Sequence, residues 1–243
     1  MIAVEICVET VQGLRAAEIA GADRVELCAC LDVGGLTPSA GMMRFAAERG
    51  LPARVLVRPR SGSFVYDDDE LGVIERDVAA ARSLGLSGVV IGAAREDGRL
   101  DRERLSRLAD RCHGLGRTLH RVFDLTPDPF ESLELAVELG FDRILTSGQA
   151  ASAAAGAGLL ARLVAAADGR ITILAAGGVN ADNLADLVRA TAVREVHASC
   201  RGPTDRLPGA GDDRFGFGRA PASADALSIK RLVTIARRTG ASD

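Results

Sequence analysis

A short motif, a glutamate and a cysteine separated by one residue, occurs twice in the first part of the chain. The first copy is Glu5 and Cys7, and the second is Glu26 and Cys28. Cysteine thiolates are preferred protein ligands of soft metal ions. Glutamates that a fold buries can transfer protons as general acids or bases. The paired motifs therefore predict a metal site or an acid–base site.

Both motifs lie in short segments whose other residues are apolar and often β-branched. In a β-strand, residues two positions apart point to the same face. The apolar residues that alternate with the motif suit a face covered by helices. We therefore expect Glu5, Cys7, Glu26 and Cys28 to point to the inside of a barrel, at the same height on two neighbouring strands.

Segments of this kind alternate with helical segments along the whole chain. We expect strands at 2–8, 24–28, 53–58, 88–92, 117–123, 142–146, 170–175 and 194–199. We expect helices near 10–20, 39–49, 69–84, 101–115, 129–139, 152–167, 180–190 and 224–238. This alternation predicts an α/β protein with a parallel sheet.

The length of 243 residues fits one (β/α)8 TIM-like barrel, which typically needs about 250. We therefore predict a single barrel domain over residues 1–243, with a doubly wound open sheet as the alternative. The stretch 201–222 is rich in Gly, Pro, Asp and Arg and interrupts the alternation. It is long for a loop without structure, so we expect either a lid over the strand ends or a disordered segment.

Further ionisable residues fall near the carboxyl ends of the predicted strands, where barrel enzymes carry their active sites. In the enzymatic hypothesis a glutamate is the base and His120 the acid. The alternative is a buried salt-bridge network in which the glutamates pair with Arg58 and Arg60. The acid–base candidates are Glu5, Glu26, His120, Asp124 and His197.

A second group of residues suits an anionic ligand. Glycine-rich turns before helices present backbone amides to phosphate groups, and arginine recognises planar anions. Together these residues predict a site for a small anionic or phosphorylated molecule. The candidates are Arg58, Arg60, Ser147, Gly148, Gly177, Gly178 and Asn180.

The composition argues against several other classes of protein. A net charge of −3 and only 3% aromatic residues argue against a surface for nucleic acid. No apolar stretch approaches the roughly 20 residues that cross a bilayer, and the N-terminus does not resemble a signal peptide. We therefore expect no membrane association and a cytoplasmic location. The only lysine, Lys230, lies in the last helical segment, which excludes a Schiff-base lysine on a strand.

An ordered series of motifs resembles the CutC family, which is named for copper homeostasis. The motifs are VEICV at 4–8, RVELC at 24–28, GGLTPS at 34–39, VRPR at 57–60, HRVFD at 120–124, RILTSGQ at 143–149, GGVN at 177–180 and VHAS at 196–199. The resemblance implies a TIM-like barrel, a cytoplasmic location and a role in copper handling, with Cu(I) as the ligand. Two features depart from the family pattern: Ala176 stands where a third glycine is usual, and the loop after Ser199 diverges.

The leading hypothesis is that Cys7 and Cys28 bind Cu(I). Neighbouring strands lie about 4.8 Å apart, so two inward thiols at one height can share a two-coordinate ion, and thiolates select Cu(I). Zinc prefers three or four ligands, and no third cysteine or close histidine is evident. The cysteines could instead be small buried hydrophobes or form a reversible disulfide.

The alternative function is an enzyme that acts on a small anionic substrate. The expected partners are thus a metal ion or a small anionic ligand. The sequence does not decide between a monomer and a homo-oligomer.

Overall fold

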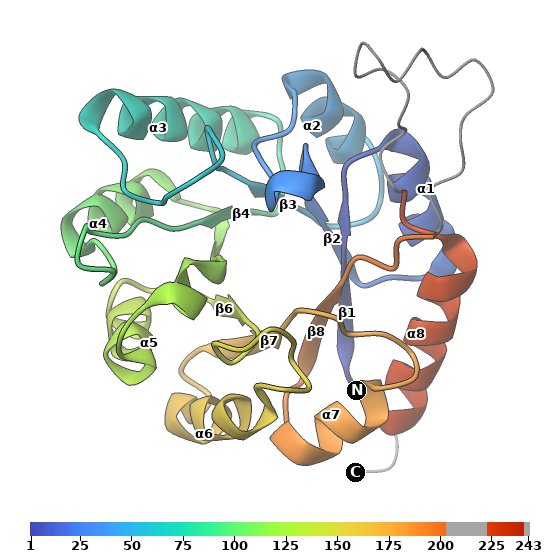
Figure 1. The fold of residues 1–243 in the computed structure, drawn as a ribbon. Coiled ribbons are helices and arrows are strands. Elements are labelled where there is room, and N and C mark those ends of the chain that lie inside the picture. The colour runs from blue at the N-terminus through green and yellow to red at the C-terminus, as the bar shows by residue number, and fades with distance from the viewer. Residues whose placement is uncertain (203–222, 241–243) are drawn as a thin grey trace, which may run out of the picture.

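The computed structural model describes residues 1–202 and 223–240, and these form a closed barrel of parallel strands in the order of the sequence (Figure 1). Strand β1 pairs with both β2 and β8, which closes the barrel. The predicted (β/α)8 fold is therefore confirmed. The strands are β1 (Ala3–Val8), β2 (Arg24–Leu27), β3 (Ala53–Leu56), β4 (Gly88–Ile91), β5 (Gly116–Leu119), β6 (Arg143–Thr146), β7 (Thr172–Ala175) and β8 (Glu195–Ala198).

The α-helices form a ring around the strands (Figure 1). They are α1 (Val11–Ala20), α2 (Ala40–Ala47), α3 (Asp68–Ser83), α4 (Arg102–Arg111), α5 (Pro129–Glu138), α6 (Ala157–Ala167), α7 (Leu184–Thr191) and α8 (Ala226–Thr239). Two 3₁₀ helices, η1 (Leu31–Val33) and η2 (Arg121–Leu125), lie in the loops after β2 and β5. Among the described residues, no helix is both long and apolar enough to span a membrane. The expected lid or disordered loop at 201–222 lies, from residue 203 onward, outside the described residues.

Most of the helices, with the exception of α6 and α7, begin where the sequence supplies a capping side chain. An oxygen on the residue before the helix accepts a hydrogen bond from a first-turn amide, which would otherwise lack a partner. At α3, Asp67 and Glu70 form a reciprocal capping box. The residues that cap their helices in this way are Thr10, Ser39, Asp67, Asp101, Asp128 and Asp225.

Strand β5 is shorter than the sequence predicted. The strand expected over 117–123 ends at Leu119, and η2 follows. His120 caps η2, because its Nδ1 atom accepts a hydrogen bond from the Val122 amide at 3.1 Å. Arg121 and Asp124 therefore lie in η2 and not in the sheet.

Buried and partly buried charged residues lie at the amino-terminal end of the barrel, and we call Arg24, Arg54, Arg143 and Glu195 the charged floor. Arg24 donates hydrogen bonds to Glu5 and to Glu195, each at 2.5 Å. Arg143 donates to the same Glu195 at 2.6 Å. Arg54 is buried beside them, and burial, followed by the charge of Arg143, lowers its pKa to about 10. The charged floor supports the residues that lie above it in the barrel.

Replacing Arg24 should destabilise the fold strongly. In Arg24→Met, Glu5 and Glu195 lose a buried cation, and breaking such a pair typically costs about 3–5 kcal/mol. The control is Arg102→Met, because Arg102 pairs with Glu138 on the surface, where an ion pair contributes less than about 1 kcal/mol. Urea unfolding measures both free energies. Equal losses in the two variants would show that the charged floor contributes no more than a surface pair.

Candidate functional site

Several predicted site residues lie together inside the barrel, above the charged floor. They come from the neighbouring strands β1, β2 and β8, where alternate residues point inward. Each is at most 9% exposed. The site therefore combines thiols, carboxylates and an imidazole in a space shielded from water. The residues are Glu5, Cys7, Glu26, Cys28 and His197.

The two cysteines do not lie at the same height, so that prediction is wrong. In the pairing of β1 with β2, Cys7 lies opposite Glu26. Cys28 is thus two residues beyond the partner of Cys7. Closing a barrel requires such a stagger, because the strands tilt relative to the barrel axis. The two cysteines nevertheless belong to one buried cluster, which also contains Leu56 and Val90.

His197 connects the two glutamates. Its Nδ1 atom lies 2.7 Å from Oε1 of Glu5, and its Nε2 atom lies 3.7 Å from Oε2 of Glu26. Burial lowers the pKa of His197, but Cys7, Glu5 and Glu26 outweigh burial and raise it well above 6.5. His197 is therefore the close histidine that was not evident from the sequence, and it is protonated at neutral pH.

The two glutamates differ in their affinity for a proton. Burial raises the pKa of Glu5, but His197 and Arg24 outweigh burial and lower it to about 2. The pKa of Glu26 is raised by burial, and the charge of His197 opposes this rise only in part. Glu5 is therefore ionised at neutral pH, and Glu26 is the stronger base of the two.

Cys28 is covered by the loop that follows β2. Its thiol donates to Oε2 of Glu26 at 3.4 Å. Burial, followed by the charge of Glu26, raises the pKa of Cys28 well above 9.0. Leu31 packs against the cysteine cluster, and a Cβ placed on Gly35 would lie 3.7 Å from the Cys28 sulfur. A metal ion that binds Cys28 must therefore displace the proton of a buried thiol beneath this loop.

Arg58 holds that loop and does not neutralise the glutamates, which corrects the expected salt-bridge network. Its NH1 atom donates to the carbonyl oxygens of Val33 and Gly35, and its NH2 atom to that of Gly62, each at 2.9 Å. Arg60 forms an ion pair with Glu70, at the start of α3. The cations that neutralise Glu5 are instead Arg24 and protonated His197.

Arg24 was missing from the sequence-based list of candidates. It lies two residues before Glu26 on β2, so the alternation that places Glu26 inward also places Arg24 inward. The signal was therefore present in the sequence.

His120 lies at the end of β5, apart from the cluster on β1, β2 and β8. Burial, followed by the charge of Arg58, lowers its pKa to about 3. Within the described residues, no hydrogen bond or ion pair joins it to Glu5, Glu26 or His197. His120 is thus a neutral imidazole at physiological pH, and it suits hydrogen bonding better than acid catalysis.

The turn after β6 already binds an anion, the carboxylate of Asp124. The amides of Ser147 and Gln149 donate to this carboxylate, each at 3.1 Å. The Gly148 amide donates instead to the hydroxyl of Thr146, at 2.9 Å. Asp124 and Ser147 therefore hold η2 against β6, and Gly148 stabilises the turn. For their predicted catalytic and anion-binding roles, these residues would have to give up these hydrogen bonds and bind a ligand instead.

The double glycine after β7 has free amides. Gly177 and Gly178 adopt φ values of 95° and 72°, which glycine tolerates best. Their amides have no acceptor among the described residues. Asn180 stabilises the following turn, since its Oδ1 atom accepts from the amides of Asp182 and Asn183. This turn delays the start of α7, which was expected near residue 180.

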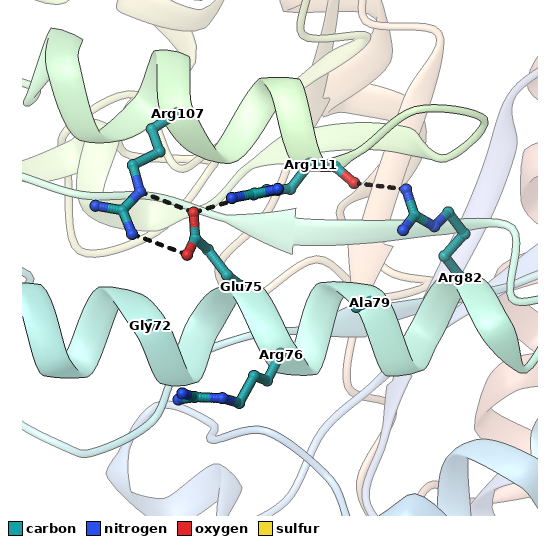
Figure 2. A pocket seen from close by; sticks show the side chains of 7 residues that line it. All are labelled: Gly72, Glu75, Arg76, Ala79, Arg82, Arg107 and Arg111. Carbon is teal, nitrogen blue, oxygen red and sulfur yellow. Dashed lines mark hydrogen bonds and ion pairs between the residues drawn. The ribbon is translucent and has the colours of Figure 1, made fainter.

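The described part of the chain contains no group of three or more His, Cys, Asp or Glu residues arranged to hold a metal ion. A surface pocket of about 400 Å³ lies between α3 and α4, outside the barrel (Figure 2). Its one carboxylate, Glu75, already accepts hydrogen bonds from Arg107 and Arg111. The barrel interior therefore remains the candidate site, and it offers a metal ion two thiols.

The fold and the buried cluster define a TIM-like barrel protein with thiols, carboxylates and an imidazole in its interior. The chain belongs to the CutC family, whose model matches residues 2–202.

Known relatives agree with this assignment. A CutC family protein of Sinorhizobium medicae is 52% identical over 82% of this chain and 81% of its own length. One from Agrobacterium fabrum is 48% identical over 95% and 92% of the two chains. The crystal structure of a putative copper homeostasis protein CutC from Streptococcus agalactiae is 36% identical, with a TM-score of 0.78 over 81% of this chain and 98% of that chain.

The raised pKa of His197 should make stability fall with rising pH. Above pH 6.5 the unfolded histidine loses its proton while the folded one keeps it. The free energy of unfolding should therefore fall by up to about 1.4 kcal/mol per pH unit until the folded pKa is reached. Urea unfolding between pH 6.5 and 8.5 should show a shallower slope in His197→Gln than in the wild type. The exposed His113 supplies the control His113→Gln, and equal slopes in all three proteins would refute the assignment.

Proposed function

We propose that this protein binds Cu(I) through the thiolates of Cys7 and Cys28 and acts in copper homeostasis in the cytoplasm. The observation that carries the proposal is that both thiols belong to one buried cluster inside the barrel. Membership of the CutC family and the similarity to a putative copper homeostasis protein support the copper assignment. The ion is a cargo in this proposal and takes no part in a reaction.

The donor set suits Cu(I) better than other metal ions. Thiolates are soft ligands, and two of them suffice for a two-coordinate ion, whereas zinc would need further ligands. Binding requires both thiols to lose their protons. Glu26 is the nearest acceptor for the proton of Cys28. Copper affinity should therefore fall as the pH is lowered.

Anaerobic titration of Cu(I) against a competing chelator tests this site. Cys7→Ser and Cys28→Ser should each weaken binding by more than the roughly 10- to 100-fold loss typical of residues that only support a ligand. Cys112→Ser is the matched control, because Cys112 is also buried but donates to the Leu108 carbonyl in α4. Unchanged affinity in both site variants would exclude the site.

A second candidate function is an enzyme that transfers protons on a small anionic substrate. It is favoured by one observation, the opposite pKa shifts of Glu5 and Glu26 within one buried site. In this proposal Glu26 is the base and protonated His197 the acid, while Glu5 keeps His197 charged. The free amides of Gly177 and Gly178 would bind the anionic group of the substrate.

Crystals soaked in phosphate test the anion site of this second candidate. Phosphate should bind at the amides of Gly177 and Gly178. The turn at Ser147 and Gly148 serves as an internal control and should stay free of phosphate, because the Asp124 carboxylate occupies its amides. A Gly177 turn without phosphate at saturating concentration would argue against this candidate.

A further inference from the structure

Three buried polar side chains around the ends of β3 and β5 lack a hydrogen-bond partner on one atom each. In the described part of the chain, only four buried side-chain nitrogen or oxygen atoms are unpaired, and three of them are Nε of Arg58, Oη of Tyr66 and Nε2 of His120. The three residues are 6%, 2% and 4% exposed. Buried polar atoms are almost always paired, so a group of three indicates that another molecule supplies the partner.

The three side chains belong to one cluster, which we call the Arg58 cluster. The guanidinium carbon of Arg58 lies 4.9 Å from the ring centre of Phe64, and that ring lies 4.6 Å from the ring of His120. The Tyr66 hydroxyl lies close to the Arg58 guanidinium, whose charge and hydrogen-bonding proximity oppose the effect of burial on the pKa of the phenol, although the two groups form no hydrogen bond of good geometry. The exposed residues 61–63 lie beside the cluster, because the Gly62 carbonyl accepts a hydrogen bond from Arg58.

Each unpaired atom of the Arg58 cluster is a hydrogen-bond donor. Nε of arginine always carries a hydrogen. His120 uses the lone pair of Nδ1 to accept from the Val122 amide. Burial lowers its pKa to about 3, so its single hydrogen is on Nε2. Burial raises the pKa of Tyr66 to about 12, so its hydroxyl keeps its proton.

The Arg58 cluster also carries a positive charge without a counter-ion. The other two nitrogens of Arg58 donate to backbone carbonyl oxygens. No carboxylate of the described residues lies within ion-pair distance of Arg58, whereas Arg24 pairs with two. A buried guanidinium without an anion is unfavourable. The missing partner is therefore an acceptor with a negative charge.

We propose that the Arg58 cluster binds the carboxylate group of a small molecule. A carboxylate is planar, carries one negative charge and has only acceptor sites. It matches one guanidinium and two neutral donors, whereas a doubly charged phosphate exceeds the single positive charge available. The site is distinct from Cys7 and Cys28 and does not require copper binding. The existence of the site depends on neither candidate function. Its proposed role, to orient a carboxylate substrate, rests on the second candidate function.

Nuclear magnetic resonance of copper-free protein labelled with ¹⁵N-histidine tests the site, with acetate as the probe. Acetate should produce a saturable shift of the His120 Nε2 resonance, and chloride at equal ionic strength should not. The exposed His113 is the internal reference. No saturable shift, or the same shift with chloride, would overturn the proposal.

Variants separate this site from its neighbours. Tyr66→Phe removes one donor and should weaken acetate binding about tenfold or more, as expected for a hydrogen bond to a charged group. Tyr66→Phe is preferred to a change at Arg58, because Arg58 also anchors the loop after β2. Arg102→Lys is the control, since Arg102 lies on the surface and already has a counter-ion in Glu138. Equal affinity in wild type and Tyr66→Phe would contradict the proposal.

Two further measurements distinguish a carboxylate site from the copper site and from a bound water. The double variant Cys7→Ser, Cys28→Ser should lose copper binding and keep its affinity for acetate. The two sites can therefore fail independently, and the measurement shows which of them has failed. A crystal structure in acetate should show the carboxylate on all three atoms. A single ordered water on these atoms, with acetate absent, would overturn the proposal.

Discussion

The ionised carboxylate of Glu5, buried in the barrel, is the constraint on which the rest of the interior depends. A charge in this position is tolerated only with close counter-charges, and here Arg24 approaches from below and His197 from the side. Arg24 must in turn share Glu195 with Arg143, which extends the charged floor across the barrel. Apolar side chains in these positions would stabilise the fold equally well. The charges of the interior are therefore better explained by their effect on the groups above them.

The effect of Glu5 on those groups is electrostatic. Together with Cys7 and Glu26, it raises the pKa of His197 and so places a positive charge beside Cys7 and Glu26. Glu26 in turn accepts the thiol hydrogen of Cys28. The four groups therefore form one interacting set, in which Glu26 can accept a proton and protonated His197 can donate one. Both candidate functions use Glu26 as a base, because a thiol must lose its proton before it binds a metal ion and a proton transfer on a substrate needs a proton acceptor.

The sequence predicted the barrel and the inward direction of Glu5, Glu26 and both cysteines, since these follow from the alternation of residues along each strand. It could not predict their relative heights, because the stagger between strands is a property of the closed barrel. It misplaced His120 and Asp124 for a different reason: hydrogen bonds of their own side chains end β5 and form η2. Tyr66 lies in a loop, where no periodic pattern indicates in which direction its side chain points.

Arg58 shows how one side chain can connect two sites. Its NH1 atom donates to the carbonyl oxygens of Val33 and Gly35 and so holds the loop that covers Cys28, while its NH2 atom donates to that of Gly62. Its third nitrogen, Nε, is directed to the Arg58 cluster and is unpaired. An anion at Nε would draw the guanidinium toward itself and compete with those carbonyl oxygens for its charge. In the proposal, the carboxylate and the loop that covers Cys28 share a single guanidinium, so binding at the Arg58 cluster would be coupled to access to Cys28.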